Sequence, residues 1–440
     1  MGWVAGSRRR VIFDRGGQAG AAPVLGPAAQ DACPPCGMRR SCAGRAIVRP
    51  GRQDRKEAEV TADPSTSPAA QAASGVRRIG LLTGGGDAPG LNAVIRSVVL
   101  AADRLGWECH GIRDGFNGLL APGSCTGEPV RRLGPGDVHA IGHLGGTILG
   151  STNRGNPLRY PTPQPDGSLL ETDRTAEVVA RCREQGLEAL VVVGGDGSMG
   201  IAEALHRRGL RVIGVPKTID NDLDHTFSTF GFDTAVGFAT ECIDRLHTTA
   251  YSQHRVMVVE VMGRYAGWIA LHAGIAGGAH AILIPELPYR IEAVAEAVRR
   301  RDAAGHHHAV VVVAEGAAPR AGGRRVRAAA EVGRAERLGG IGAEIEGELA
   351  RLTGKECRTA VLGHLLRGGS PSAFDRVCAS RFGAAAVRAL AAGHSGVMVA
   401  LGWQAIELVP LSAVAGRTKQ VPVDGDTVAT ARELGICLGD

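Results

Sequence analysis

The chain has 440 residues, of which 44% are hydrophobic and 21% are charged. This length exceeds what one simple core needs and the composition is that of an ordinary globular protein, so we expect two lobes. No apolar run approaches the roughly 20 residues that span a bilayer, and the N-terminus lacks the apolar stretch of a secretory signal. We therefore expect a cytoplasmic protein, and the ten scattered cysteines are typical of a reducing compartment.

The formal net charge of +6 is concentrated near the N-terminus. Residues 1–76 carry 11 Arg and Lys residues against six Asp and Glu residues, so the rest of the chain is almost neutral. A nearly neutral folded part argues against a nucleic-acid-binding surface. The same residues are rich in Ala, Gly, Pro and Arg without sustained periodicity, which predicts a disordered basic extension and linker. Cys33, Cys36 and Cys42 could form a zinc or redox site there, but no fourth ligand follows at zinc-finger spacing.

The ordered region, residues 77–440, begins with a short apolar strand at 78–83. The sequence Gly-Gly-Gly-Asp-Ala-Pro-Gly-Leu-Asn follows at 84–92, and a helical apolar period starts after it. A strand, a glycine turn and a helix N-terminus together present backbone N–H groups that can bind a phosphate. Because neither the P-loop nor the dinucleotide-binding glycine pattern is present, the turn could also be a plain strand-to-helix reversal.

A second glycine turn lies further along the chain. Small residues at 145–153 lead to Arg154, whose guanidinium could reach a ligand phosphate or lie in solvent, and a helix is predicted near 174–185. The apolar run 189–193 then indicates a strand buried on both faces. It ends at Gly194-Gly195-Asp196-Gly197-Ser198, where Asp196 could hold Mg²⁺ beside a polyphosphate.

The strand at 210–215 ends at the sequence Pro-Lys-Thr-Ile-Asp-Asn-Asp, residues 216–222. It places Lys217, Asp220 and Asp222 at the carboxyl end of a strand, where parallel α/β sheets bind ligands. A cation beside two carboxylates suits a phosphate, a metal ion and proton abstraction from a hydroxyl. A self-paired charged loop that caps a helix is the alternative. Only four of the chain's 50 basic residues are lysines, so Lys217 in this loop favours the functional interpretation.

Strands and helices continue to alternate towards the C-terminus. Helices are predicted at 231–249 and 376–390, strands at 256–259, 281–286 and 309–314, and a loop in the Arg-rich segment 318–336. This alternation predicts an α/β fold with parallel sheets, whose ligand site is assembled from loops that follow separate strands.

The chain resembles the phosphofructokinase family over residues 77–440, because five motifs occur in the family's order. They lie at 82–92, 194–198 and 216–222, with Met-Gly-Arg at 262–264 and Leu-Gly-His-Leu-Leu-Arg-Gly-Gly-Ser-Pro at 362–371. The resemblance implies an α/β fold of two interleaved Rossmann-like parallel-sheet lobes with the active site between them. It also implies glycolytic transfer of a phosphoryl group to the 1-hydroxyl of D-fructose 6-phosphate, with Mg²⁺ as cofactor.

The resemblance assigns chemical roles to individual residues. Asp220 would be the base that takes the proton of the sugar hydroxyl, and Thr218 would lie beside the moving phosphoryl group. Gly85 would help to cradle that group, and Arg264 would stabilise the charge of the transition state. The carboxylates implied to hold magnesium are Asp196 and Asp222.

The resemblance also implies two sets of binding residues. The donor would contact Gly85, Arg154, Asp196, Gly197, Ser198 and Lys217. Fructose 6-phosphate would contact Thr218, Asp220, Arg255, Met262, Gly263, Arg264, Glu315, Arg358, His364 and Arg367. In the family, the residues that match Arg255 and Arg358 reach into a neighbouring subunit's site, which implies a homo-oligomer, either a dimer or a tetramer, with shared sites.

Two positions bear on the identity of the donor. Family members that use ATP tend to have glycine at the position of Gly197, which leaves space for the α-phosphate, whereas pyrophosphate-dependent members tend to have aspartate. Lys217, in contrast, matches the residue of the pyrophosphate users, and a cation there favours a compact polyanion. We expect ATP as the donor and keep pyrophosphate as the alternative.

Two other classes of protein share part of the pattern. A lipid or NAD kinase with the Gly-Gly-Asp-Gly turn would not need the sugar-phosphate motifs at 262–264 and 362–371. A non-catalytic regulator that binds a sugar phosphate would be free to lose Asp220 and Arg264, yet the chain has both.

Overall fold

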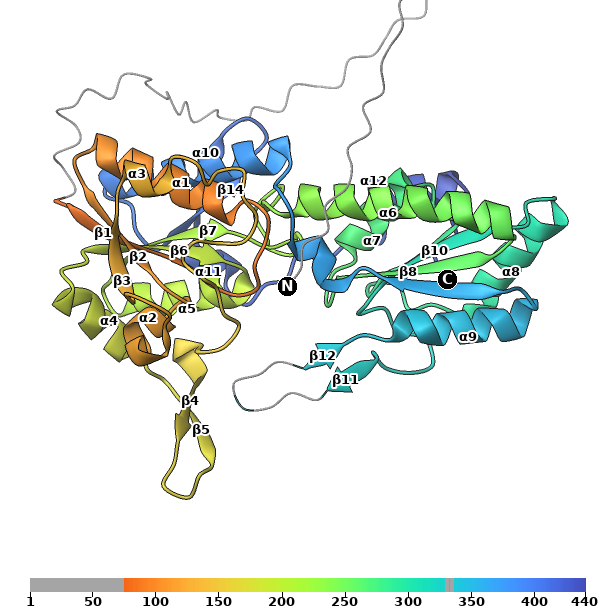
Figure 1. The fold of residues 1–440 in the computed structure, drawn as a ribbon, viewed down its shortest axis with the longest axis horizontal. Helices are drawn as coiled ribbons and strands as arrows, with labels where there is room; N and C mark the ends of the chain where they lie inside the picture. The colour runs from red at the N-terminus through yellow and green to blue at the C-terminus, as the bar shows by residue number, and fades with distance from the viewer. Residues whose placement is uncertain (1–74, 329–331, 333–335) are drawn as a thin grey trace, which may run out of the picture. The chain divides into compact units, whose positions relative to one another are not determined.

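Two largely parallel β-sheets, each covered by helices on both faces, organise the part of the chain that the computed structural model describes, residues 75–328, 332 and 336–440 (Figure 1). All of these residues belong to one compact unit, Asp63–Asp440. The structure therefore confirms the predicted α/β class. The seven cysteines of the described part are free, whereas Cys33, Cys36 and Cys42 lie outside it.

The larger sheet has seven strands in the order β15-β14-β7-β6-β1-β2-β3. The five inner strands are parallel, and β3 and β15 are antiparallel edge strands. Its strands are β1 (Arg78–Thr83), β2 (Glu108–Ile112), β3 (Val130–Leu133), β6 (Ala189–Gly194), β7 (Arg211–Pro216), β14 (Val397–Leu401) and β15 (Ile406–Pro410).

The apolar run of β6 explains how this sheet is covered. Its side chains alternate between two cores, with Val191 and Val193 in one and Leu190 and Val192 in the other, and all four are fully buried. A strand buried on both faces needs helices on both sides. On one face these are α1 (Leu91–Arg104), α3 (Pro135–Val138) and α10 (Ala373–Ala391), and on the other α2 (Asn117–Leu120), α4 (Thr175–Glu184), α5 (Asp196–Arg207) and α11 (Leu411–Val414).

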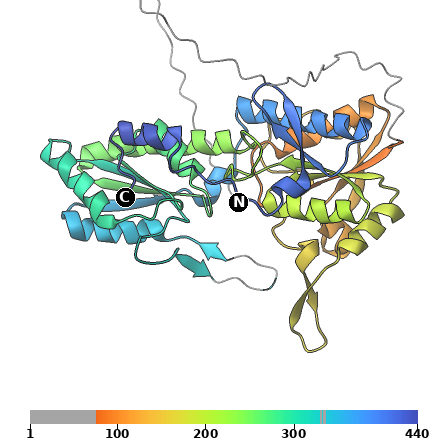
Figure 2. The same ribbon diagram turned by 180° about the vertical axis from the view of Figure 1, so that it is seen from behind.

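The smaller sheet has four parallel strands in the order β13-β8-β10-β9. They are β8 (Val256–Val261), β9 (Ala281–Leu283), β10 (Ala309–Ala314) and β13 (Cys357–Val361). One face packs against α6 (Phe232–Gln253), α7 (Trp268–Ala276) and α12 (Asp426–Glu433), and the other against α8 (Ile291–Ala303) and α9 (Ile341–Thr353) (Figure 2). The chain returns from this sheet to α10 and β14, so each lobe is built from more than one stretch of sequence.

Two short hairpins lie outside these layers. One is an arm formed by β4 (Tyr160–Pro163) and β5 (Leu169–Thr172), which pair only with each other (Figure 1). The other pairs β11 (Val326–Ala328), which lies inside the segment 318–336 predicted as a loop, with β12 (Arg337–Leu338), which directly follows that segment. Short 3₁₀ turns complete the described part, namely η2 (Pro122–Ser124), η3 (Pro157–Arg159) and η4 (Gly363–Arg367).

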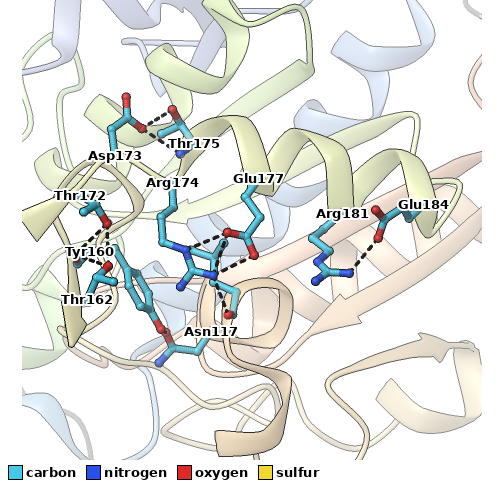
Figure 3. A network of polar contacts seen from close by, with 11 residues as sticks. Asn117, Tyr160, Thr162, Thr172, Asp173, Arg174, Thr175, Glu177, Arg181 and Glu184 are labelled. Atoms are coloured by element: carbon cyan, nitrogen blue, oxygen red, sulfur yellow. Dashed lines mark hydrogen bonds and ion pairs between the residues drawn. The ribbon is translucent and has the colours of Figure 1, made fainter. Parts of the chain in front are cut away.

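Polar side chains fix the base of the arm (Figure 3). The Arg174 guanidinium lies 4.5 Å from the centre of the Tyr160 ring and donates two hydrogen bonds of 2.8 Å to the Glu177 carboxylate. Asp173 accepts a 2.8 Å hydrogen bond from the Thr175 N–H at the start of α4. The base of the arm is thereby tied to the first turn of α4.

The predicted helices agree with the observed ones apart from their ends, and α6 continues to Gln253 instead of ending near residue 249. Within the described ranges, no helix combines the length and the apolar character needed to cross a membrane.

Candidate active site

The carboxyl ends of β1 and β6 meet at the switch point of the larger sheet. From β1 the strand order proceeds through β2 to one edge, and from β6 it proceeds through β7 to the other edge. In open α/β sheets, ligands bind in the crevice that such a divergence leaves. Both predicted glycine turns follow these two strands, so the fold brings them side by side.

The first glycine turn is held by backbone hydrogen bonds to its neighbours. Gly84 N donates to Val193 O at 2.8 Å, and Gly85 N donates to Thr152 O at 3.1 Å. The N–H that the resemblance assigned to a phosphate at Gly85 is therefore already paired here. Among the described residues, the N–H groups of the adjacent Gly86 and Asp87 have no partner, so this turn keeps free donors next to Gly85.

A cavity of about 310 Å³ lies at the switch point. The turns after β1, β6 and β7, the loop 152–156 and the end of η4 all contribute to its wall. The predicted site residues that line it are Gly85, Arg154, Asp196, Gly197, Ser198, Lys217, Thr218, Asp220, Asp222 and Arg367. The structure thus brings together all the residues predicted for the donor and the metal, and the predicted base.

Asp220 presents a buried carboxylate oxygen to this region. Its backbone N–H donates to Thr218 Oγ1 at 3.1 Å, whereas its Oδ1 has no hydrogen-bond partner among the described residues. Burial, with the negative charges of Asp222 and Glu315, raises the pKa of Asp220 to about 7. A carboxylate with an unpaired oxygen and a pKa near neutrality can accept a proton from a hydroxyl group.

Lys217 lies against the first glycine turn. Its side chain is buried, and its Nζ donates a hydrogen bond to Gly86 O. Burial lowers the pKa of Lys217 to about 8, and the neighbouring Arg367 guanidinium acts in the same direction. At Gly85, where φ is 78°, an added Cβ would lie 3.4 Å from Lys217 Nζ. A phosphate at this turn would therefore meet a buried ammonium group.

Asp196 and Asp222 face the same cavity from the loops after β6 and β7. Asp196 Oδ1 accepts a 2.8 Å hydrogen bond from Gly416 N. Burial raises the pKa of Asp222, and the nearby negative charge of Asp196 adds to this rise. A divalent cation relieves such repulsion, and magnesium in kinases needs only one or two carboxylates besides the phosphates. The pair fits a magnesium site, and the described residues contain no larger metal-binding cluster of His, Cys, Asp and Glu.

The remaining donor-side residues differ in their surroundings. Gly197 is exposed, and a Cβ built on it would meet no atom within 4 Å, so packing does not demand glycine there. Ser198 is buried, and its Oγ would lie 2.9 Å from a Cβ at Gly84 and 2.1 Å from one at Gly194. Both glycine turns therefore close around this hydroxyl. Arg154 is exposed and contributes to the cavity wall.

A second group of predicted residues lies at the carboxyl ends of the smaller sheet. Met262, Gly263 and Arg264 follow β8, and Glu315 follows β10. Gly316 N donates to Gly263 O at 3.1 Å, which ties the two loops together. Burial raises the pKa of Glu315, while the positive charge of Arg264 opposes this rise.

Arg367 connects the two groups. Its Nη1 donates to Asp87 O in the first glycine turn at 3.1 Å. The positive charge of Arg367 acts to lower the pKa of Lys217, Asp220 and Glu315. His364, on the same turn, also acts to lower the pKa of Glu315. The phosphate side and the predicted sugar side thus form one electrostatic unit.

Arg255 and Arg358 do not join this unit. Arg255 immediately precedes β8, and the strand register pairs Arg358 with Met257. At about 3.3 Å per residue, β8 carries the chain roughly 20 Å from there to Arg264. Both guanidinium groups instead contact the Glu356 carboxylate, at 2.9 Å from Arg255 Nε and 2.5 Å from Arg358 Nη2. They lie at the amino ends of the strands, away from the cavity of their own chain.

Sequence reasoning missed two elements of support. Glu260 on β8 is buried, and its carboxylate accepts hydrogen bonds from Gly340 N at 3.3 Å and Gly342 N at 2.8 Å, which fixes the start of α9. Residues 416–419 contact the loops that carry both predicted metal ligands. The sequence offered no direct sign of either, apart from the rarity of lysine, which applies to Lys419 as much as to Lys217.

Comparisons with known proteins identify the family of the chain. The family model described as "Phosphofructokinase" matches residues 78–390. A protein of Chloroflexus aggregans named ATP-dependent 6-phosphofructokinase is 54% identical over 368 residues, which cover 84% of this chain and 99% of that protein. A protein of Amycolatopsis mediterranei named pyrophosphate–fructose 6-phosphate 1-phosphotransferase is 50% identical over 349 residues, which cover 79% and 97% of the two chains.

The fold of the chain also resembles that of a solved structure. Pichia pastoris phosphofructokinase in the T-state matches with a TM-score of 0.65 and 28% identity, over 82% of this chain and 37% of that longer chain. The match of the family model covers most of the chain, and residues from four of the five motifs line the switch-point cavity. The chain belongs to the phosphofructokinase family.

Proposed function

We propose that this protein is an ATP-dependent 6-phosphofructokinase. It transfers a phosphoryl group from ATP to the 1-hydroxyl of D-fructose 6-phosphate and yields fructose 1,6-bisphosphate for glycolysis. The name of the Chloroflexus aggregans relative supports this activity. The observation that carries the proposal is Asp220, whose buried Oδ1 has no partner within the described part of the chain and which lines a cavity together with Lys217 and Arg367.

The chain's own groups supply the positioning and the charge that phosphoryl transfer needs. Asp220 accepts the proton of the 1-hydroxyl as the sugar oxygen attacks the terminal phosphorus. Lys217, Arg367 and the N–H of Gly86 hold the phosphate oxygens, and Thr218 keeps the base in place because its Oγ1 accepts a hydrogen bond from the Asp220 N–H. Arg264 stabilises the charge that develops on the moving group.

Asp196 and Asp222 are the residues that would hold Mg²⁺, which would neutralise charge on the donor phosphates. Burial raises the pKa of Asp222 and the negative charge of Asp196 adds to the rise, and the closeness of these two carboxylates supports the assignment. Gly85, Arg154, Gly197 and Ser198 complete the donor side of the cavity.

We place the sugar phosphate at the carboxyl ends of the smaller sheet. Met262, Gly263, Glu315 and His364 would contact it there, together with Arg264. Arg255 and Arg358 are too far from these residues to touch the same molecule. Their position supports a homo-oligomer, a dimer or a tetramer, in which they complete the site of another subunit.

Pyrophosphate is the second candidate donor. The buried Lys217 ammonium beside the first glycine turn favours a compact polyanion, and the Amycolatopsis mediterranei relative is named for pyrophosphate. The open space at Gly197 favours ATP instead, because it leaves room for an α-phosphate. Nothing in the chemistry of Asp220 distinguishes the two donors.

Residues 77–440 would carry the catalysis, and residues 1–76 would be a basic extension and linker. We propose that the substrates are small molecules in the cytoplasm and that neither nucleic acid nor a membrane is a partner.

The purified full-length protein tests the proposal when it is supplied with fructose 6-phosphate and Mg²⁺ and with either ATP or pyrophosphate. We expect fructose 1,6-bisphosphate to form with ATP. Product with pyrophosphate alone would correct the donor and leave the acceptor reaction intact. Absence of product with both donors would contradict the proposed function.

A further inference from the structure

Residues 416–419, between α11 and α12, lie against both loops that carry the proposed magnesium ligands. Gly416 N donates to Asp196 Oδ1 at 2.8 Å, in the turn after β6. Lys419 N donates to Asp222 O at 2.8 Å, in the loop after β7. Between these contacts, Thr418 forms an antiparallel bridge with Leu223. One short segment from the C-terminal part of the chain thus connects two carboxylates that come from separate strands.

The Lys419 side chain ends in a cradle of oxygen atoms. Its Nζ donates hydrogen bonds to Asn221 Oδ1 at 2.9 Å, to Thr226 O at 2.9 Å and to Phe227 O at 3.4 Å. An ammonium group has three N–H donors and no acceptor, so these three oxygens match its whole capacity. The loop 221–227 is therefore folded around a single positive charge.

Asn221 connects the Lys419 ammonium group to the two carboxylates of the proposed site. It lies between Asp220 and Asp222 in sequence, and its backbone is left-handed, with φ at 52°. Its Oδ1 also accepts a 3.2 Å hydrogen bond from Thr229 N, so the side chain is held from two directions. The turn at Asn221 sets the directions of the carboxylates on either side, because a left-handed residue reverses the local course of the chain.

Trp268 holds the lysine in place. Its indole N–H donates to Lys419 O at 3.0 Å, and Lys419 Nζ lies 5.6 Å from the centre of the indole ring. An aromatic face at this distance attracts a cation. The ammonium group therefore contacts three oxygen atoms and lies near the Trp268 ring. The hydrogen bond from the Trp268 indole to Lys419 O also fixes the backbone that carries this side chain.

We propose that Lys419 is a positioning residue, which holds the Asn221 turn so that Asp220 and Asp222 point into the cavity. This inference rests on the proposed function, because it assigns those two carboxylates to proton transfer and magnesium binding. Lys419 itself does not line the cavity, so it acts through Asn221 and the backbone of Asp222. Removal of the ammonium group should leave a site that a small free cation of the same chemistry can occupy.

Two variants separate positioning from packing. Lys419→Ala removes the whole side chain, and Lys419→Met keeps an apolar chain beside Trp268 while removing the ammonium. For both we expect kcat to fall about 10- to 100-fold, the effect of slightly misplaced reacting groups, and the Mg²⁺ concentration for half-maximal rate to rise. The KM for fructose 6-phosphate should change little, because the residues proposed to hold its phosphate and ring follow strands of the smaller sheet and only Thr218 and Asp220 of the sugar contacts lie on this loop.

Ammonium chloride provides the decisive comparison. With Lys419→Ala, it should restore part of kcat, whereas sodium chloride at the same ionic strength should not. Lys419→Met should not be restored, because its side chain blocks the cradle. Arg174→Met is the matched control, since Arg174 also lies over an aromatic ring and donates to a backbone carbonyl, that of Leu120, at 3.2 Å (Figure 3). It should lose thermal stability without any ammonium-dependent recovery.

The proposal is overturned if folded Lys419→Met keeps the kcat and Mg²⁺ dependence of the unaltered protein, or if ammonium helps Lys419→Ala no more than sodium does. Failure of the proposed function would look different, because the unaltered protein itself would then be inactive. If the unaltered protein were inactive, amide hydrogen exchange over residues 218–229 would still test whether Lys419 holds the Asn221 turn. The Asp220 and Thr229 amides should exchange faster in Lys419→Ala and slow again with ammonium, and unchanged exchange would refute the role of Lys419.

Discussion

Asp220 and Lys217 are both buried beside the cavity, and burial moves their pKa values towards each other, to about 7 and about 8. Removal from water disfavours the charged form of each group, which raises the pKa of a carboxyl and lowers that of an ammonium. The opposite charges of the neighbours limit both shifts. The proposed base and the proposed phosphate-binding cation therefore both have pKa values near neutral pH.

The pH dependence of kcat/KM should therefore have two limbs. Activity should rise as pH passes about 7, because Asp220 must lose its proton to act as a base, and fall as pH passes about 8, because Lys217 must keep its charge to hold a phosphate. The profile of kcat/KM reports such groups in the free enzyme. Lys217→Met should lower kcat/KM and remove the alkaline limb, and an unchanged alkaline limb would assign that titration to another group.

Replacement of the base should separate chemistry from binding. Asp220→Asn should lower kcat by about 10²- to 10⁴-fold, the usual contribution of a general base, while calorimetry still detects binding of fructose 6-phosphate. Asp220→Glu should recover less than full activity, because the longer side chain displaces the carboxylate. Turnover close to that of the unaltered protein in Asp220→Asn would refute the assignment.

The same substitution should raise stability by an amount that depends on pH. The pKa of Asp220 is raised from 3.8 to about 7 on folding, so the folded state keeps a proton that the unfolded state loses between these values. The contribution of Asp220 to stability is therefore largest at low pH and falls as pH rises towards 7. The gain in melting temperature from Asp220→Asn should be larger at pH 8 than at pH 5.

At the scale of elements, the first turn of α5 bears on the choice of donor. A Cβ at Gly197 would meet open space, and the same holds for Gly200 one turn later in the helix. Gly197→Asp should therefore fold normally, but its negative charge should repel the α-phosphate of ATP at a cost of several kcal/mol. We expect kcat/KM for ATP to fall at least about 100-fold with little effect on pyrophosphate. Gly200→Asp is the control, and equal losses in both variants would point to general damage to α5.

The strands that build the site could be predicted from the sequence. The runs that became β1, β6 and β7 are continuous and apolar, as a parallel sheet covered on both faces requires, and each ends at glycine or charged residues. The motif residues then share one edge of the sheet, so Asp196, Lys217 and Asp220 had to lie close together. Strand order was not available from the sequence, because pairing between distant strands leaves no local periodicity.

Contacts between distant segments explain what was missed. Lys419 meets Asn221 across 198 positions, and Glu260 meets Gly342 across 82. In the sequence alone, each of these four residues looks like an ordinary surface or strand residue. The paired Gly85 N–H could not be foreseen either, since its acceptor, Thr152 O, lies in a loop without a regular pattern.

The β4–β5 arm was missed although its turn had a recognisable sequence. Pro165-Asp166-Gly167 is a common turn sequence between two strands, but the strands lack the alternation of a half-buried hairpin. Leu169 and Leu170 are exposed instead. Such a two-stranded sheet gains little from burial.

We therefore expect the arm to be dispensable for folding. A variant in which a Gly-Gly pair replaces residues 162–170, with Tyr160 and Arg174 retained at the base, should keep its kcat and lose no more than a few degrees of melting temperature, since about 1 kcal/mol shifts the midpoint of a domain this size by only ~2–4 °C. Loss of activity at unchanged melting temperature would instead show that the arm supports the loop 152–156.

At the scale of the whole molecule, Arg255 and Arg358 give the strongest indication of shared sites. Both lie at the amino ends of the smaller sheet, on the far side from Arg264, and Glu356 holds them together. A single chain cannot bring them to its own cavity without breaking β8. An oligomer can supply them from another subunit, as the family resemblance implies.

Mixed oligomers test this arrangement. Asp220→Asn and Arg255→Ala should each be nearly inactive alone, because each lacks one part of every site. If the two are unfolded and refolded together, some sites should contain both an intact Asp220 and an intact Arg255, and activity should recover to a fraction of that of the unaltered protein. No recovery in oligomers shown to be mixed would place both residues in the site of one chain.

We propose above that Asp220 acts as the base in the transfer of a phosphoryl group from ATP to the 1-hydroxyl of fructose 6-phosphate. The most direct measurement is ³¹P NMR of fructose 6-phosphate and Mg-ATP mixed with the unaltered protein and with Asp220→Asn. We expect a second sugar phosphomonoester, at carbon 1, to appear together with ADP in the first sample and not in the second. ADP that appears with inorganic phosphate alone, or a new phosphate at another carbon of the sugar, would contradict it.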